Sequence, residues 1–283
     1  MIEVELATGA PFAAAHLFTF LGARAVPGVE AWDGSTFHRA LSLPGGHGIV
    51  RLSPGAPATV HAAFELADER DLDDGVQLVR RLLDLGADAT TIDAALATDP
   101  VLAPLVAGMP GLRVAGSVDP FETAVRAVIG QQISVAGART VAGRIVASAG
   151  QPLAVDGGPL THVFPTPVAL TVIDPDLLPM PMSRRRTIVE LAGRVSDGRV
   201  VFAADRPHVE ALLLDVPGIG PWTAGYLRMR GLGDPDVFLA TDLGVKVGMA
   251  RLGIDAAHAE RWRPWRTYAL HHVWTAAGFP PAG

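Results

Sequence analysis

The residues with the clearest chemical potential are a carboxylate and an aromatic side chain in the last third of the chain. Asp242 lies between Thr241 and Leu243 where a helix is expected to begin, twenty positions after Trp222. A helix start fixes the position of such a carboxylate, and the helix dipole suits a negative charge there. A fixed carboxylate can stabilise positive charge that develops on a bound substrate. The alternative is that Asp242 only caps the helix, and the two roles are compatible.

The stretch before Asp242 reads as a helix, a tight turn and a second helix. One helix ends over Ala211–Leu214, the turn is Pro217-Gly218-Ile219-Gly220, and a helical period returns from Trp222 to Arg230. The two glycines suit a turn of this tightness and leave the backbone amides open to a phosphate oxygen. The amino end of the second helix faces the same place, so the turn predicts an anion site that needs no basic side chain.

Three segments carry a family resemblance: VPGIGPWTAGY (216–226), DVFLATDLGVK (236–246) and RWRPWRTYALHHVW (261–274). In these the chain resembles the helix-hairpin-helix DNA glycosylases, and among them the AlkA-type 3-methyladenine DNA glycosylase II, over nearly its whole length. The resemblance implies an α+β fold. It places a TATA-binding-protein-like α/β domain with an antiparallel sheet at residues 1–112. An all-α, two-lobed helix-hairpin-helix core follows at residues 113–283.

The same resemblance implies a monofunctional glycosylase that flips N-alkylated purines, such as 3-methyladenine and 7-methylguanine, out of duplex DNA and hydrolyses the N-glycosidic bond. Asp242 is then the catalytic carboxylate, which stabilises an oxocarbenium-like transition state. Trp222, Tyr226, Trp274 and Phe20 are expected to line the substrate cleft, where electron-rich rings attract a cationic base. For Phe20 and Trp274 the alternative is packing in the core. Trp262 and Trp265 are interpreted as core residues.

The resemblance also implies the contacts with DNA. Gln131 and Gln132 are expected to probe the minor groove, Gln132 at the position of the wedge that fills the gap left by a flipped base. The alternative is that the pair caps a helix break. No cofactor is required, although the backbone carbonyls of Leu214, Val216 and Ile219 match the family's site for a structural Na⁺ or K⁺. The expected DNA-binding residues are Gln131, Gln132, Pro217, Gly218, Ile219, Gly220, Thr223 and Lys246.

The position of lysine argues against strand cleavage. Relatives that cut the strand attack the sugar with a lysine amine in the second hairpin helix, and here that position is Trp222. The chain has a single lysine, Lys246, one helical turn after Asp242, where it can pair with the carboxylate or with a phosphate. Water is therefore the expected nucleophile. The alternatives are a non-catalytic helix-hairpin-helix DNA-binding module and a glycosylase for other damaged purines.

Composition limits the class of protein. The 283 residues are 49% hydrophobic and include no cysteine, which excludes disulfides and cysteine-ligated zinc or iron–sulfur clusters. No long apolar run or leader is apparent, so we expect a cytoplasmic monomer that does not bind membranes. The net charge of −6 is unusual for a protein whose expected partner is double-stranded DNA containing alkylated bases, but residues 181–283 carry 13 basic and 10 acidic side chains.

Periodicity predicts the elements that position these residues. Strands are expected at 2–6, 37–43, 48–52 and 59–66, with helices at 11–25 and 74–85. From Asp99 onward the pattern is helical, and Asp119, Pro120 and Glu122 form a helix start with a capping box. Residues 150–183, rich in Pro and Gly, are predicted to be a surface connection.

Overall fold

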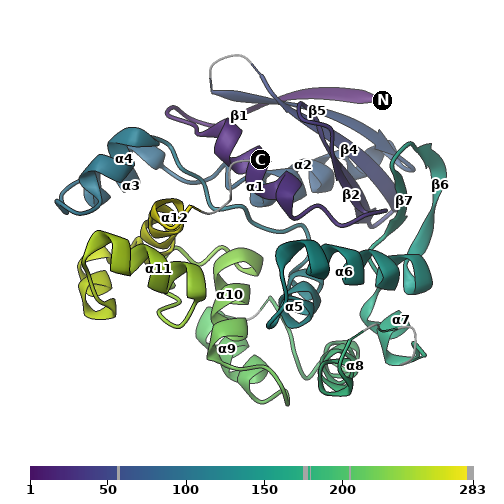
Figure 1. The fold of residues 1–283 in the computed structure, drawn as a ribbon. Coiled ribbons are helices and arrows are strands. Elements are labelled where there is room, and N and C mark those ends of the chain that lie inside the picture. The colour runs from purple at the N-terminus through teal and green to yellow at the C-terminus, as the bar shows by residue number, and fades with distance from the viewer. Residues whose placement is uncertain (56–57, 175–177, 179, 204, 279–283) are drawn as a thin grey trace.

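The amino-terminal part of the chain is built on a five-stranded antiparallel sheet (Figure 1). The computed structural model describes residues 1–55, 58–174, 178, 180–203 and 205–278. In spatial order the strands are β1 (Ile2–Ala7), β5 (Thr59–Leu66), β4 (Gly46–Pro54), β3 (Phe37–Leu43) and β2 (Glu30–Trp32). The four strands predicted from alternation are present. Of the strands in this sheet, the sequence analysis missed the three-residue edge strand β2.

One face of the sheet is covered by two helices, α1 (Ala14–Ala23) and α2 (Leu72–Leu82). Phe37, Leu41 and Phe64 point to this face and are fully buried beneath the helices. The opposite face carries Ala40 and Ile49, which belong to a second buried cluster. Because side chains alternate between the two faces along each strand, the sheet contributes residues to two separate cores.

The rest of the chain is mainly helical. Several of its helices begin at an aspartate whose side chain accepts a backbone N–H, among them Asp119, Asp205 and Asp242. The elements are α3 (Ala89–Leu96), α4 (Ala103–Gly108), α5 (Pro120–Ile129), α6 (Val135–Ala149), α7 (Pro167–Thr171), α8 (Met182–Ser196), α9 (Arg206–Leu214), α10 (Pro221–Gly231), α11 (Leu243–Leu252) and α12 (Arg266–Ala276), with 3₁₀ helices η1 (Glu69–Asp71) and η3 (Ala256–Trp262).

The two cores divide these helices into lobes. One core joins the sheet, α1 and α2 to residues of α11, η3 and α12, and the other is built mainly from α5 to α10 and includes Ala40 and Ile49 of the sheet. The predicted α+β fold with a two-lobed helical part is thus confirmed, while the division at residue 112 remains a prediction. None of the helices in the described part of the chain is long and apolar enough to cross a membrane.

One local prediction was wrong and another was only half correct. Residues 150–183 are not a plain surface connection, because they contain the β6 (Gln151–Gly157) and β7 (Leu160–Val163) hairpin and α7. Apolar side chains of this segment, Leu160, Val163 and Leu170, are buried in the second core. The capping box at Asp119 is also half correct: Asp119 caps α5, but Glu122 points into a buried ion-pair network instead of back to the cap.

Candidate active site

Helices α9 and α10 and the turn between them form the predicted helix-hairpin-helix. In the turn, Val216 N–H donates to the Leu213 carbonyl and Ile219 N–H donates to the Val216 carbonyl, both at 3.0 Å. Gly218 has φ +91°, and a Cβ there would collide with Thr187 of α8. The hydroxyl of Thr187 donates to the Pro217 carbonyl at 2.9 Å. Glycine is required at 218 by the backbone and by the packing of α8.

Gly220 serves a different purpose from Gly218. It is the N-cap of α10 with extended backbone (φ −102°, ψ 179°), and a Cβ there would meet nothing within 4 Å. No side chain caps α10, so the first N–H groups of the helix lie beside an open backbone surface. Pro217 and Gly218 are exposed on this surface, whereas the Ile219 side chain is buried. Only the backbone of Ile219 is available to a phosphate.

The structure gives Gln131 and Thr223 internal partners. The Gln131 side-chain amide donates to the Gly218 carbonyl and to the Thr223 hydroxyl, both at 3.1 Å. The Thr223 side chain is buried. These two expected DNA-binding residues therefore join the hairpin to the α5–α6 turn, and their contact with DNA stays a prediction.

Gln132 lies at the tip of the α5–α6 turn. Its side chain is exposed, and its φ of +58° is left-handed, a conformation that costs a non-glycine residue about 1 kcal/mol or more. The exposed apolar side chains of Ile133 and Val135 follow it. This placement is compatible with the wedge role predicted for Gln132, which stays a prediction.

Asp242 is held by three donors. Its Oδ1 accepts the Val245 N–H at 3.0 Å, which makes Asp242 the N-cap of α11, and also the Trp274 indole N–H at 2.9 Å. Its Oδ2 accepts the Trp222 indole N–H at 3.1 Å. The three donors come from α11, α12 and α10, so three helices fix one carboxylate. Sequence analysis placed both tryptophans in the cleft but did not predict that they hold Asp242.

Trp222 and Tyr226 form one wall of the site. Their rings stack at 5.2 Å between centroids, as their spacing of four on α10 allows. The Tyr226 hydroxyl accepts a hydrogen bond from Arg230 at 2.9 Å. Burial alone would raise the pKa of Tyr226, but the nearby guanidinium groups of Arg230 and Arg24 lower it below its usual value.

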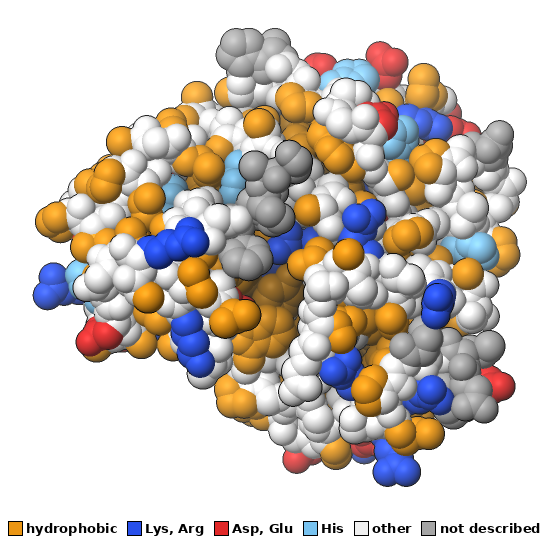
Figure 2. Space-filling model, viewed as in Figure 1, with side chains coloured by type: hydrophobic (Ala, Val, Ile, Leu, Met, Phe, Trp, Pro, Cys, Tyr) orange, Lys and Arg blue, Asp and Glu red, His pale blue; other side chains and the backbone are white. Residues whose placement is uncertain are grey.

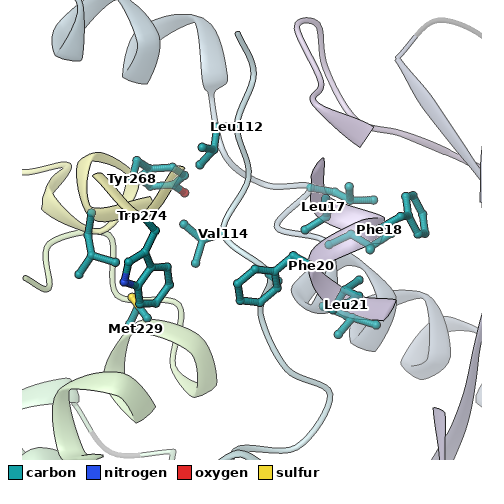
Figure 3. Close-up of a cluster of buried hydrophobic side chains, with 14 of the residues drawn as sticks. Leu17, Phe18, Phe20, Leu21, Leu112, Val114, Met229, Tyr268 and Trp274 are labelled. Atoms are coloured by element: carbon teal, nitrogen blue, oxygen red, sulfur yellow. The ribbon is translucent and has the colours of Figure 1, made fainter. Parts of the chain in front are cut away.

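The rings of Phe20 of α1 and Trp274 of α12 face each other (Figure 3). Their rings are stacked with centroids 6.5 Å apart, and Phe20 is only 3% exposed. The guanidinium of Arg24 lies over the Phe20 ring, 3.7 Å from its centroid. Arg24, and not Phe20, lines the cavity at this point. The expectation that Phe20 lines the cleft therefore needs correction, because it supports Trp274 and Arg24 from the core.

A buried ion-pair network that the sequence analysis did not find lines another part of the site. Arg39 pairs with Glu30 at 2.9 Å and with Glu122, and Arg126 pairs with the same two carboxylates at 3.0 and 2.8 Å. Burial alone would raise the pKa of Glu122, but Arg39 and Arg126 hold it well below its usual value. The only sequence signal was the spacing of four between Glu122 and Arg126 on α5.

These groups surround a cavity of about 440 Å³. Figure 2 shows this side of the molecule hollowed between α10–α12 and α5–α6, with apolar side chains inside the hollow and Lys or Arg side chains at its edge. The lining residues include Asp242, Trp222, Tyr226 and Trp274. A second hollow, of about 900 Å³ between α2 and α10, shares Arg230 but does not contain Asp242.

Lys246 and the remaining tryptophans lie outside this constellation. Lys246 is exposed on α11, and in the described part of the chain no carboxylate pairs with it, so the pairing with Asp242 considered from sequence is absent. Trp262 is buried and donates to Asp99 at 2.8 Å, and Trp265 is half-buried against the first core. The assignment of these two tryptophans to the core is confirmed.

Comparison with known proteins agrees with this architecture. The AlkA N-terminal domain model matches residues 3–119. The solved structure of a 3-methyladenine DNA-glycosylase from Archaeoglobus fulgidus superposes with a TM-score of 0.83 over 99% of both chains, at 24% identity. The fold and the hairpin thus define the class: a helix-hairpin-helix protein with the architecture of the DNA glycosylases.

Sequence relatives specify the family. DNA-3-methyladenine glycosylase 2 of Escherichia coli is 35% identical over 280 residues, which cover 96% of each chain. A probable bifunctional transcriptional activator/DNA repair enzyme AlkA of Mycobacterium tuberculosis is 45% identical over 99% of this chain. The chain spans 58% of the length of that relative. The chain belongs to the AlkA family of DNA-3-methyladenine glycosylases.

Proposed function

We propose that the chain is a monofunctional DNA glycosylase that flips N-alkylated purines, of the 3-methyladenine and 7-methylguanine type, out of duplex DNA and releases them by hydrolysis. The observation that carries the proposal is the Asp242 carboxylate, oriented by two indole N–H groups at the wall of an aromatic cavity. Family membership supports the same reaction.

Asp242 acts on the sugar. Breaking the N-glycosidic bond leaves positive charge on the anomeric carbon, and a carboxylate at fixed position stabilises that charge without having to reorganise. Because Trp222 and Trp274 occupy lone pairs on both oxygens, the carboxylate cannot rotate freely. Its position relative to the cavity is therefore set before the substrate arrives.

The aromatic wall acts on the base. A flipped purine can stack on the Trp222 and Tyr226 rings, which themselves are stacked and face the cavity. An N-alkylated purine carries a positive charge, and each such ring attracts it by about 0.5–2 kcal/mol. The charged base is already a good leaving group, so discrimination among bases matters more than a strong general acid.

Water is the proposed nucleophile. Trp222 stands where a lysine would be needed for a covalent intermediate, and the single lysine is exposed on α11. A Schiff base with the sugar requires an amine at the reacting carbon. The reaction then ends with an abasic site in an uncut strand.

Double-stranded DNA is the proposed partner, bound by a monomer. The open backbone around Gly220 and the uncapped first turn of α10 suit a phosphate. Among the described residues, no backbone N–H donates to the Leu214 or Ile219 carbonyl, and the Val216 carbonyl accepts one N–H. These carbonyl oxygens are therefore proposed to bind a monovalent cation, which would hold the turn in shape and supply charge near the phosphate.

Base release tests the proposal. The protein is incubated with a methylated duplex, and chromatography names the freed bases. We expect 3-methyladenine and 7-methylguanine, an intact strand that breaks only on later heating with alkali, and no complex trapped by borohydride. A trapped adduct at neutral pH would overturn the monofunctional reaction, and tight binding without any base release would favour the non-catalytic module.

A further inference from the structure

Arg24 differs from the other arginines of the cavity in its partners. Arg39 and Arg126 are paired with carboxylates, while Arg139 and Arg230 donate to backbone carbonyls at 2.7 Å. In contrast, Arg24 makes a long contact of 3.4 Å from Nη1 to the Phe20 carbonyl and a hydrogen bond with the side chain of Tyr226. No carboxylate in the described part of the chain pairs with it.

The surroundings of Arg24 keep its guanidinium in the cavity wall. One face of the group rests on the Phe20 ring, and the Tyr226 hydroxyl lies close by. Burial lowers the pKa of Arg24 to about 10, with the Tyr226 interaction opposing and Arg230 and Arg126 adding to this effect. The side chain remains charged at neutral pH and has lost much of its water. A guanidinium has five N–H donors in a planar fork, so among the described residues Arg24 keeps donors for a ligand beyond those that face the Phe20 carbonyl and the Tyr226 hydroxyl.

We propose that Arg24 determines specificity within the proposed reaction by donating its fork to the O6 and N7 acceptors on one edge of a flipped guanine-type base. Paired donation to O6 and N7 is the commonest specific contact of arginine with a purine. Adenine offers N7 but an amino group at position 6, which is a donor and cannot accept from the fork. Because this inference concerns the same cavity, it rests on the proposed function.

Charge makes the hydrogen bonds necessary. The residues that line the cavity include five arginines against three carboxylates, Glu30, Glu122 and Asp242. A cationic alkylated purine is therefore not attracted to the Arg24 side of the cavity by charge. A base gains from Arg24 only if its acceptors compensate the repulsion. 3-Methylguanine leaves both O6 and N7 open, whereas 3-methyladenine has the same methyl position and charge without O6.

The experiment compares these two bases. Single-turnover release of 3-methylguanine and 3-methyladenine is measured for the parent, Arg24→Met and Arg24→Lys, with Arg199→Met as a control. Arg199 is an exposed arginine beyond the end of α8 that pairs with Asp197. Met removes the charge and keeps most of the stem, and Lys keeps the charge but loses the fork.

We expect Arg24→Met to slow release of 3-methylguanine about tenfold, the lower range for a bidentate arginine contact, and to leave 3-methyladenine within about threefold. Arg24→Lys should show the same selective loss of 3-methylguanine release. This variant tests the inference by itself if the Met variant does not fold. An equal loss for both bases would overturn the inference in favour of a phosphate or packing contact, as would no loss. If the parent releases neither base, the proposed function itself fails.

Discussion

Asp242 combines the two roles that its sequence position suggested. Oδ1 caps α11 through Val245, and the same carboxylate is held by the indoles of Trp222 and Trp274. A cap needs one oxygen, so the second oxygen is available to fix orientation. Capping and catalysis are thus not competing interpretations, because the cap is one of the three contacts that aim the carboxylate.

Replacing Asp242 by Asn separates charge from position. The Asn oxygen can still cap α11, but its amino group cannot accept the indole N–H of one tryptophan, so we expect a loss of about 1 kcal/mol in the free energy of unfolding. Removing the charge should slow excision of 3-methyladenine on the order of a hundredfold or more. Single-turnover release measures the rate, and a melting curve checks the fold. Excision within a few-fold of the parent would leave Asp242 as a cap only.

Sequence analysis found the residues of the site better than their contacts. Asp242, Trp222, Tyr226 and Trp274 all line the cavity, because the family motif marks them. Arg24 was not predicted, although it lies four positions after Phe20, at the C-cap of the same helix. A single sequence does not tell which of two neighbouring side chains faces the cavity, since that depends on how α1 packs against α10 and α12.

The hairpin illustrates how one element uses two glycines for different reasons. Gly218 needs its positive φ and lies against Thr187, whereas Gly220 has an ordinary backbone and open space around it. From the sequence, both glycines were explained in the same way, by the tightness of the turn and by the need for open backbone amides. In the structure only Gly220 has no internal reason to be glycine, which supports its role toward an outside partner.

We therefore expect Gly220→Val to fold normally and to bind DNA more weakly. The Cβ of the new side chain would meet no protein atom within 4 Å, and we expect its methyl groups to cover the N–H groups at the start of α10. Affinity for an abasic duplex, measured by fluorescence anisotropy, should fall about tenfold, the loss of one or two charge-assisted hydrogen bonds.

Gly218→Val is the matched control for this variant. Its side chain would collide with Thr187 and strain a backbone at φ +91°, so it should lower the melting temperature strongly. Unchanged DNA affinity in a folded Gly220→Val protein would remove this part of the hairpin from the DNA interface.

Elements beyond the motif were less predictable. The strands of the sheet and α5 followed from alternation and caps, but the β6–β7 hairpin was hidden by its Pro and Gly content. Glu122 was interpreted as a capping residue because local spacing suggested it, while its partner Arg39 lies 83 positions earlier. Pairings between distant segments depend on the tertiary fold and leave no local pattern.

The site forms where the two cores of the molecule meet. Arg24 and Trp274 belong to elements around the sheet core, whereas Gly130 and Ala142 of the opposite cavity wall lie among the helices of the second core. Although the chain has a net charge of −6, its cavity is lined by more arginines than carboxylates. The cleft therefore carries a local excess of positive charge, which suits DNA, even though the total charge of the chain is negative.

Stability at low pH depends on two histidines behind this cleft. His271 contacts the Trp274 ring and His272 follows it on α12, and both are at most 2% exposed. Burial, with His16 nearby, lowers the pKa of His271 well below its usual value and that of His272 to about 4. Neither ring nitrogen of His272 has a hydrogen-bond partner among the described residues.

These shifts give the sign of the pH dependence. Above pH 6.5 both states hold neutral histidines, and the pKa shifts have no effect on stability. As the pH falls from 6.5 toward 4, the histidines of the unfolded chain bind protons and those of the folded chain do not, so the free energy of unfolding decreases. For His272 alone this decrease is on the order of 3 kcal/mol at pH 4. Asp84, whose burial raises its pKa to about 6, opposes this trend in the same range.

A variant isolates the histidine contribution from that of Asp84. His272→Leu removes the titrating ring and keeps an apolar side chain, while Asp84 is common to both proteins and cancels in their difference. We expect urea denaturation to show a smaller loss of stability between pH 7.5 and pH 5 in His272→Leu than in the parent, so the difference between the two free energies of unfolding should shift in favour of the variant as the pH is lowered. If the free energies of unfolding of the two proteins run parallel over this range, protonation of His272 does not contribute to the pH dependence of stability. Other groups would then cause the acid sensitivity of the fold.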